Sequence, residues 1–510
     1  MHLLLGSWGS RNSRFILGMR LRNRDTGSLA KYLHPLNIGR RTQTSKGGPV
    51  TQEREPRLTP EVVQKLRDRI AALSELGCLW GEAEPPNLDL CDAITDRLTH
   101  NYPYGDARYA GQILKPPHPV AFAAYATTML LNPNNHALDG GPATAAMERE
   151  AVAAIADMFE MRTFLGHLTS SGTIANLEAL WVGREQRPGQ AVLYGANAHY
   201  THERMCRLLG VTGDSIPQDV HGRMNLAALD ARLAAGGVGT VIATLGTTAL
   251  GALDQTHAIA ELCARHDARL HIDAAYGGFH KLLADGEQPG VEAAPYSALS
   301  AAESIVVDPH KHGLQPYGCG CVIFKDPSVA RLYAHESPYT YFSSDELHLG
   351  EISLECSRAG AAAAALWATL TAVPLTRQGL GDFLAGGRAA ALHVAELIEE
   401  HPAIALAVQP ELDIVCPFLK CDTTSQVSEA SNLAFASLAR VGWHVAKLKV
   451  SSEWLCTIHP GIRLNSKSTV ILRSCFMKPE HASLADSYVE ALRTAFSLID
   501  RKSTRHAKRK

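Results

Sequence analysis

Short apolar runs alternate with longer amphipathic segments over residues 125–330. The apolar runs are rich in β-branched residues and predict strands, whereas the segments between them carry hydrophobic residues every three or four positions and predict helices. The predicted strands lie at 241–246, 269–276, 304–310 and 319–324, and two of the predicted helices lie at 177–186 and 257–267. This alternation predicts an α/β fold in which a largely parallel sheet has helices on both faces.

The pattern changes outside that region. The first 55 residues are rich in Lys and Arg, poor in acids and without a long apolar run, which predicts a disordered extension. Thr59 followed by Pro60 predicts a helix start, with Thr59 as N-cap and Pro60 at the first helical position. Residues 384–400 predict a helix that leads into a smaller C-terminal domain, which includes strand-like runs at 411–419 and 468–477.

The composition excludes several classes of protein. Hydrophobic residues make up 46% of the 510 residues and charged residues 20%, as is usual for a soluble enzyme. The net charge of −2 gives no sign of nucleic-acid binding, and no apolar run is long enough to cross a bilayer. The 11 cysteines follow no regular framework, which favours free thiols in a reducing compartment.

Two residues at predicted strand ends suggest a specific chemistry. Asp273 ends one apolar run, and Lys311 follows another inside Asp-Pro-His-Lys-His. The carboxyl ends of strands are where open α/β sheets bind ligands. A lysine amine can form a Schiff base with the aldehyde of pyridoxal 5′-phosphate (PLP), and an aspartate can keep the pyridine nitrogen protonated. The alternative is a surface lysine in a turn and an aspartate that caps the next helix.

A third segment adds a candidate phosphate site. Residues 165–180 contain a Ser-Ser-Gly-Thr turn that opens an apolar-patterned helix. Free backbone N–H groups at a helix N-terminus bind phosphate, and glycine allows close approach. An ordinary Ser/Thr N-cap is the alternative. The order of phosphate turn, acid and lysine along the chain favours the PLP interpretation.

These motifs carry a family resemblance. SSGTIANLEAL, AHYTHE, ATLGTTALGALD, HIDAAYGG and DPHKHG, in this order, resemble the group II PLP-dependent amino-acid decarboxylases, which include the aromatic amino-acid, tyrosine, glutamate and diaminobutyrate decarboxylases. The resemblance covers roughly residues 95–480. It implies a PLP-dependent transferase fold of type I (aspartate aminotransferase-like) with a smaller C-terminal α+β domain. It also implies decarboxylation of an L-amino acid to its amine and CO₂ by a homodimer with a shared active site.

The resemblance assigns roles around the cofactor ring. Lys311 matches the lysine that binds PLP covalently, and His310 matches the histidine beside it. Asp273 matches the acid that pairs with the pyridine nitrogen, and Ala275 the small residue under the ring. His199 matches the histidine that stacks on the other ring face.

Further roles concern the phosphate and the substrate. Ser171, Gly172 and Thr173 match the phosphate cradle. Thr247, in Leu-Gly-Thr-Thr, matches a threonine near the cofactor. Arg473 falls where the family places an arginine for the substrate α-carboxylate, and its planar guanidinium fits a carboxylate.

The polar and aromatic stretch 335–350 predicts a mobile loop. The resemblance implies that this loop closes over the substrate and supplies a tyrosine that protonates the carbanion, with Tyr341 favoured over Tyr339. A packed surface loop with its aromatics in the dimer interface is the alternative. Arg358, which follows the loop, is a candidate to hold a phosphate, the substrate carboxylate or the loop.

Metal binding is not expected. Cys319 and Cys321 are closer in sequence than the usual zinc pair, and His199-Tyr-Thr-His202-Glu203 does not have the order of the zinc motif HExxH. Four alternatives to a decarboxylase use the same scaffold: a PLP-dependent carbon–carbon lyase, an aldehyde synthase, an aminotransferase and a non-catalytic PLP-binding protein. The substrate is expected to be selected by residues 101–119 and the partner's loop.

The domain organisation follows from these observations. We expect a basic disordered extension, an N-terminal helical dimerisation segment, a large PLP-binding domain, a small C-terminal domain and a basic tail, with the boundaries 1–55, 56–124, 125–378, 379–500 and 501–510. A cytoplasmic location without membrane or nucleic-acid partners is expected. The Arg-rich start is also typical of a mitochondrial transit peptide, and this alternative stays open.

Overall fold

The computed structural model describes residues 60–74, 88–136, 140–334 and 352–507. The chain divides into two units, Met1–Glu55 and Pro56–Lys510, and all described residues belong to the second. No helix among the described residues is long and apolar enough to cross a membrane.

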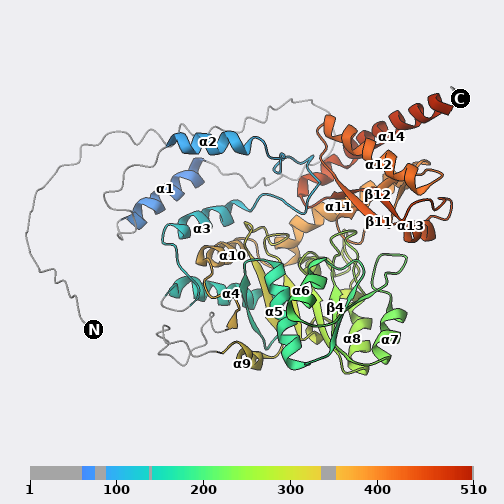
Figure 1. Cartoon of the computed structure of the whole chain (residues 1–510). Helices are drawn as coiled ribbons and strands as arrows, with labels where there is room; N and C mark the ends of the chain where they lie inside the picture. The colour runs from blue at the N-terminus through green and yellow to red at the C-terminus, as the bar shows by residue number, and fades with distance from the viewer. Residues whose placement is uncertain (1–59, 75–87, 137–139, 335–351, 508–510) are drawn as a thin grey trace, which may run out of the picture. The chain divides into compact units, whose positions relative to one another are not determined.

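A seven-stranded mixed sheet forms the centre of the large domain (Figure 1). Its strand order is β1-β7-β6-β5-β4-β2-β3. Neighbouring strands run parallel except at β7, which pairs antiparallel with both β1 and β6. The strands are β1 (Leu165–Thr169), β2 (Ala191–Gly195), β3 (Gly213–Ile216), β4 (Val238–Thr244), β5 (Arg269–Asp273), β6 (Ser304–Val307) and β7 (Gly320–Phe324). The predicted α/β fold with a mostly parallel sheet is confirmed.

Helices cover both faces of this sheet, because alternate strand residues point to opposite sides. In β4, Val241 belongs to the same buried cluster as Ile259 of the helix α8, whereas the next residue, Ile242, packs with Met205 of α6 on the other side. The helices of this domain are α4 (Pro142–Met158), α5 (Gly172–Gln186), α6 (Thr201–Leu209), α7 (Leu226–Ala234), α8 (Thr256–Arg265), α9 (Ala330–Tyr333) and α10 (Gly360–Ala372). Burial on both faces explains why the strands read as continuous apolar runs.

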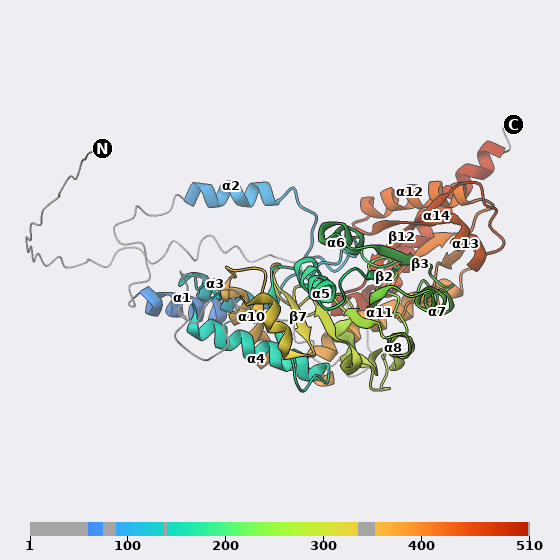
Figure 2. The ribbon, with the colours of Figure 1, turned by 60° about the horizontal axis from the view of Figure 1, so that its bottom comes forward.

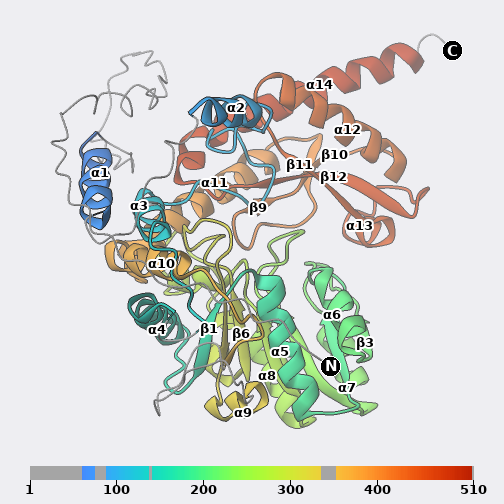
Figure 3. The ribbon, with the colours of Figure 1, turned by 60° about the vertical axis from the view of Figure 1, so that its left-hand side comes forward.

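Three N-terminal helices precede α4 in the described part of the chain: α1 (Pro60–Ser74), α2 (Leu88–Leu98) and α3 (Pro119–Met129). The predicted helix start at Pro60 is confirmed. Helix α10 lies beside α3 and α4 in all three views (Figure 1, Figure 2 and Figure 3), which ties α3 to the large domain. Along α2, Leu90, Ile94 and Leu98 recur every four residues and are each more than half exposed, at 62%, 57% and 57%.

The C-terminal elements form a smaller α+β region, coloured orange to red in Figure 1. It contains an antiparallel three-stranded sheet, β11-β12-β9, and a two-stranded sheet, β10-β8. Its elements are α11 (Asp382–Glu399), β8 (Ile404–Leu406), β9 (Ile414–Val415), β10 (Pro417–Leu419), α12 (Thr424–Arg440), β11 (Ala446–Ser451), α13 (Ser452–Ile458), β12 (Ser468–Cys475) and α14 (Ala485–Ala507). Because α14 continues to Ala507, most of the expected basic tail extends this last helix.

Candidate active site

A cavity opens at the carboxyl ends of the central strands, where parallel sheets bind ligands. Its walls come from the N-terminus of α5, the start of α6 and the loops that follow β4, β5 and β6. The lining residues are Ser171, Gly172, Thr173, Asn176, His199, Thr201, Thr244, Gly246, Thr248, Asp273, Ala275, Tyr276, Asp308, His310 and Lys311. The fold therefore brings most of the predicted site residues together.

Lys311 lies in the turn after β6 and pairs with Asp308. Its Nζ is 2.9 Å from Asp308 Oδ2, and the two side chains are 19% and 4% exposed. Burial alone would lower the pKa of Lys311, but the charge and hydrogen bond of Asp308 raise it. The other carboxylate oxygen, Asp308 Oδ1, is buried and has no hydrogen-bond partner among the described residues.

Asp273, at the end of β5, is held by His202, a residue to which the sequence motifs assigned no role at the cofactor. His202 Nε2 lies 2.9 Å from Asp273 Oδ2, and the two side chains are 0% and 6% exposed. Burial alone would raise the pKa of Asp273, but the hydrogen bond from His202, with the charges of His202 and Lys311, holds it well below its usual range. The Asp273 carboxyl is therefore ionised at neutral pH. His202 follows His199 by three residues, at the start of α6, and this closeness in sequence could have indicated a shared site.

His199 and His310 line the cavity through their rings. His199 Nδ1 lies 2.8 Å from the hydroxyl of Thr201, and burial lowers the pKa of His199. His310 Nδ1 lies 2.7 Å from the carbonyl oxygen of Cys319, and burial likewise lowers its pKa. Both imidazoles are therefore neutral at physiological pH, and each is oriented by a fixed neighbour.

The turn before α5 places backbone N–H groups at the cavity. Ser171 is the N-cap, and its Oγ accepts a hydrogen bond from the Ile174 N–H at 3.3 Å. Gly172 is the first helical residue, and a Cβ built on it would lie 2.5 Å from Asp308 Oδ2. Only glycine fits this position without displacing the Asp308 carboxylate. This turn combines the two properties that anion sites at helix N-termini use, which are unpaired N–H groups and close approach.

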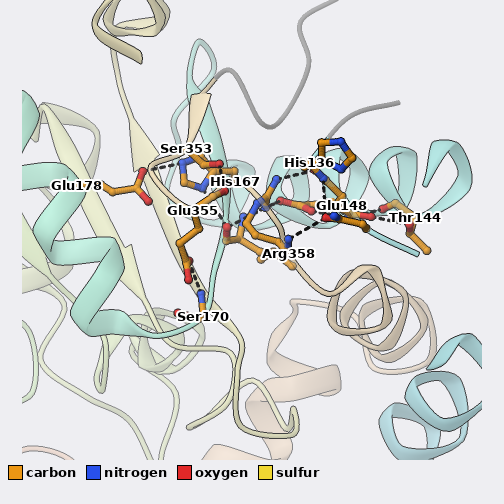
Figure 4. Close-up of polar contacts among 12 residues, drawn as sticks. His136, Thr144, Glu148, His167, Ser170, Glu178, Ser353, Glu355 and Arg358 are labelled. Atoms are coloured by element: carbon orange, nitrogen blue, oxygen red, sulfur yellow. Dashed lines mark hydrogen bonds and ion pairs between the residues drawn. The ribbon is translucent and has the colours of Figure 1, made fainter. Parts of the chain in front are cut away.

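A polar network, partly buried, holds this turn (Figure 4). Glu355 accepts a hydrogen bond from the Ser170 N–H at 2.7 Å. Arg358 forms an ion pair with Glu148 and donates to the Leu168 carbonyl at 2.9 Å, and Glu148 accepts the Leu168 N–H at 2.9 Å. In the described structure Arg358 thus fixes the end of β1.

Two predicted residues lie beside the cavity but do not line it. Thr247 is buried in the turn after β4, where its hydroxyl accepts the Ala252 N–H at 3.1 Å, while Thr244 and Thr248 line the wall. Arg473, on β12, is 9% exposed, and its Nη1 donates to the Thr248 carbonyl at 2.8 Å. The predicted proton donors Tyr339 and Tyr341 lie outside the described residues.

The cavity fits PLP by the chemistry of its groups. An ionised, buried carboxyl at Asp273 suits a protonated pyridine nitrogen, and the Lys311 amine suits an aldehyde. The Ser171–Gly172–Thr173 turn offers backbone donors for a phosphate. The buried Thr244 Oγ1 has no hydrogen-bond partner among the described residues, so the wall also has a polar group to offer a ligand.

Comparisons with known proteins agree with this arrangement. Residues 120–420 match the family described as the pyridoxal-dependent decarboxylase conserved domain. The chain is 27% identical over 417 residues to an L-tyrosine decarboxylase of Enterococcus faecium, covering 61% of this chain and 67% of that protein. It is 30% identical over 336 residues to a probable L-aspartate decarboxylase of Halobacterium salinarum, covering 65% and 85%. It is 31% identical over 318 residues to an L-2,4-diaminobutyrate decarboxylase of Rhizobium meliloti, covering 58% and 62%.

Solved structures show the same fold. The crystal structure of mouse CSAD aligns with a TM-score of 0.70 at 20% identity and covers 86% of this chain and 99% of that one. The structure of Oryza sativa TDC with PLP and tryptamine aligns with a TM-score of 0.70 at 18% identity and covers 86% and 96%. At these identities the likeness is one of fold, and it extends well beyond residues 120–420.

Proposed function

The chain belongs to the pyridoxal-dependent decarboxylase family, and we propose that Lys311, Asp273 and His199 are the residues that serve its chemistry. The protein is a PLP-dependent amino-acid decarboxylase of fold type I. When bound, PLP supplies an electron sink that takes up the electron pair left when CO₂ departs. The observation that carries the residue assignment is that Lys311 and Asp273, from the ends of two adjacent strands, line one cavity with the helix N-terminus of α5.

We propose that Lys311 holds the cofactor aldehyde and that Asp308 positions its amine. Asp308 Oδ2 lies 2.9 Å from Nζ, and its charge and hydrogen bond raise the pKa of Lys311, so they stabilise the charged form of the free amine. The same contact orients the Lys311 side chain in the cavity before the substrate enters.

Asp273 is proposed to hold the proton of the pyridine nitrogen. Its carboxylate stays charged because His202 donates to it inside the protein. A charged acid at this place favours the protonated ring, which is the better electron acceptor. In this proposal His202 is a positioning residue, since it acts through Asp273.

Further residues are proposed to position the cofactor and substrate. With PLP bound, His199 would contact one face of the ring, Ala275 would leave room on the other, and the Ser171–Gly172–Thr173 turn would donate to the phosphate; all of these residues lie at the cavity. Arg473 is proposed to orient the substrate α-carboxylate. Its guanidinium is anchored to the Thr248 carbonyl beside the cavity wall, and its Nε has no hydrogen-bond partner among the described residues.

We propose a homodimer whose active site includes the partner's loop. Leu90, Ile94 and Leu98 form an exposed apolar face on α2, and a second copy of this chain is the expected cover. Sedimentation should therefore show a dimer. Mixing two inactive chains, Lys311→Ala and Tyr341→Phe, should restore part of the activity through hybrid dimers. Hybrid dimers that form yet stay inactive would contradict the shared site or the choice of Tyr341, and repeating the mixture with Tyr339→Phe separates those outcomes.

The substrate is tested by CO₂ release. The three relatives described above carry the names of tyrosine, aspartate and 2,4-diaminobutyrate decarboxylases, and we propose that the substrate is a free L-amino acid of this range. The screen should cover the twenty standard amino acids, ornithine and diaminobutyrate, with the amine product identified by mass spectrometry. Release of ammonia or peroxide would indicate aldehyde synthesis, and consumption of a keto acid would indicate transamination.

A cytoplasmic location is also part of the proposal. Cys263, Cys321 and Cys475 are buried free thiols, which suits a reducing compartment. Fractionation of cells that express the full chain tests this, and recovery in mitochondria would assign a targeting role to the basic N-terminal segment.

A further inference from the structure

A second cluster of polar side chains lies behind the wall of the cavity. His280, in the 3₁₀ helix Gly278–Leu283, and His312, directly after Lys311, face Asp413, which precedes β9. His312 Nε2 is 3.4 Å and His280 Nε2 is 3.9 Å from Asp413 Oδ2, and all three side chains are at most 1% exposed. The two histidine rings meet edge to face, with their centroids 4.6 Å apart.

The imidazoles of this cluster lack partners. Both ring nitrogens of His280 and both of His312 are buried without a hydrogen bond to any described group. Asp413 is better satisfied, because its Oδ1 accepts the hydroxyl hydrogen of Tyr276. Buried polar atoms in native proteins are nearly always paired with protein, water or an ion. Both Nε2 atoms lie near one carboxylate oxygen, and none of the four ring nitrogens has a hydrogen bond among the described residues, which indicates that another group occupies the space between these side chains.

We propose that His280, His312 and Asp413 bind a divalent transition-metal ion, with zinc as the expected occupant. Two imidazoles and a carboxylate are a common zinc set, and zinc bonds of about 2.0–2.2 Å separate tetrahedral ligand atoms by about 3.4 Å. The 3.4 Å between His312 Nε2 and Asp413 Oδ2 already meets this value. The 3.9 Å between His280 Nε2 and Asp413 Oδ2 needs only a small side-chain movement. All candidate ligand atoms lie within 4.8 Å of one another.

The environment sets the affinity of the cluster for a cation. Arg388 and Lys115 lie close enough to act electrostatically on His280, and their positive charges oppose a divalent ion. Arg388 is fixed by three carbonyl oxygens, whereas Lys115 makes one hydrogen bond within the described part of the chain, to the Met477 carbonyl at 3.3 Å. Removal of the Lys115 charge should therefore tighten metal binding.

An ion at this place would join the two domains behind the cofactor cavity. His280 and His312 belong to the large domain, and Asp413 belongs to the C-terminal region. Tyr276 lines the cavity and donates to Asp413, so the wall shares a group with the cluster. The proposed role is structural, and it is independent of the substrate and of the residue roles proposed above.

The test measures metal content and stability of the untagged PLP-loaded protein. After exposure to zinc or cobalt and removal of loose ions, mass spectrometry should find one ion per chain, and bound cobalt should show visible d–d absorption. His280→Leu and Asp413→Asn should each weaken metal binding at least tenfold. His257→Leu is the matched control, because His257 on α8 also has an unpartnered ring nitrogen but lies outside the cluster.

Stability distinguishes a metal site from an empty cluster. If the ion is present, a strong chelator should lower the thermal midpoint of the wild type, and His280→Leu should remove this response. An empty cluster predicts instead that His280→Leu preserves or raises the thermal midpoint, because leucine then replaces a buried imidazole without a hydrogen bond. Lys115→Met keeps all three ligands and should bind the ion more tightly. Wild-type and Lys115→Met proteins that take up no zinc, cobalt, nickel or manganese would overturn the proposal, as would equal binding by His280→Leu.

Discussion

The pair formed by His202 and Asp273 is the best place to test the site assignment, because the chain contains a matched pair at its surface. His202 and Asp273 are 2.9 Å apart and are 0% and 6% exposed. His266 and Asp230 are also 2.9 Å apart but are 20% and 45% exposed. Leucine in place of either histidine removes the same hydrogen bond in two different environments. Only the buried change should leave a carboxylate without access to water.

The size of the effect follows from burial. A hydrogen bond to a buried charged group contributes about 1.5–3 kcal/mol to stability, whereas an exposed pair contributes about 0–1 kcal/mol. Domains of roughly 150–250 residues lose about 2–4 °C of thermal midpoint per kcal/mol, and larger ones lose less. His202→Leu should therefore lower the midpoint of the apo protein by a few degrees and His266→Leu by almost nothing. His202→Gln, which keeps an N–H donor, should recover part of the loss.

The pH dependence gives the refuting result. In the wild type the pKa of folded Asp273 lies below its ordinary value of 3.8, so its contribution is present above that value and is lost as the pH falls through the folded pKa. Without His202 the folded pKa of Asp273 rises, because only the charges of Lys311 and His271 then oppose burial, so this contribution to stability shrinks. The gap between wild type and His202→Leu should thus be larger near neutral pH than well below the ordinary pKa of 3.8, where the contribution is lost in both proteins. The acid limb of the activity profile should also move to higher pH. A variant whose midpoint and acid limb both match the wild type would refute the role of His202.

Three further predictions follow from the cavity and the ends of the chain. Borohydride treatment of the PLP-loaded protein should fix the label on Lys311, as peptide mapping would show, and a label on another lysine would contradict the assignment. Gly172→Ala should weaken PLP binding by about tenfold or more because its Cβ meets Asp308, whereas Gly461→Ala, with nothing within 4 Å, should not. In proteins that also carry Asp308→Ala, Gly172→Ala should no longer weaken PLP binding. A loss of PLP affinity that persists without the Asp308 carboxylate would show that contact with this carboxylate is not its cause. A protein without residues 1–55 should keep PLP binding, turnover and thermal midpoint, and a weakened dimer would show that this segment contributes to assembly.

Local patterns in the sequence determined the sheet of this protein and the places of its main site residues. Strands buried on both faces need continuous apolar runs, so the sheet could be predicted from runs such as 241–246 and 304–310. Functional groups of a parallel sheet gather where strands end, so Asp273 and Lys311 were identifiable before any contact was known. The order of the motifs then indicated the cofactor and the family.

Only the tertiary structure decided which residues meet. His202 reaches Asp273 across 71 positions because α6 packs against the end of β5, and no periodicity encodes that contact. Thr244, at the end of β4, and Thr248, in the turn after it, line the cavity, whereas the hydroxyl of Thr247 accepts a backbone N–H of the turn itself. The cluster of His280, His312 and Asp413 joins three segments that lie far apart in the sequence, and no motif relates them to one another. Such contacts depend on how preformed elements pack, and packing is a property of the whole chain that near-neighbour patterns do not contain.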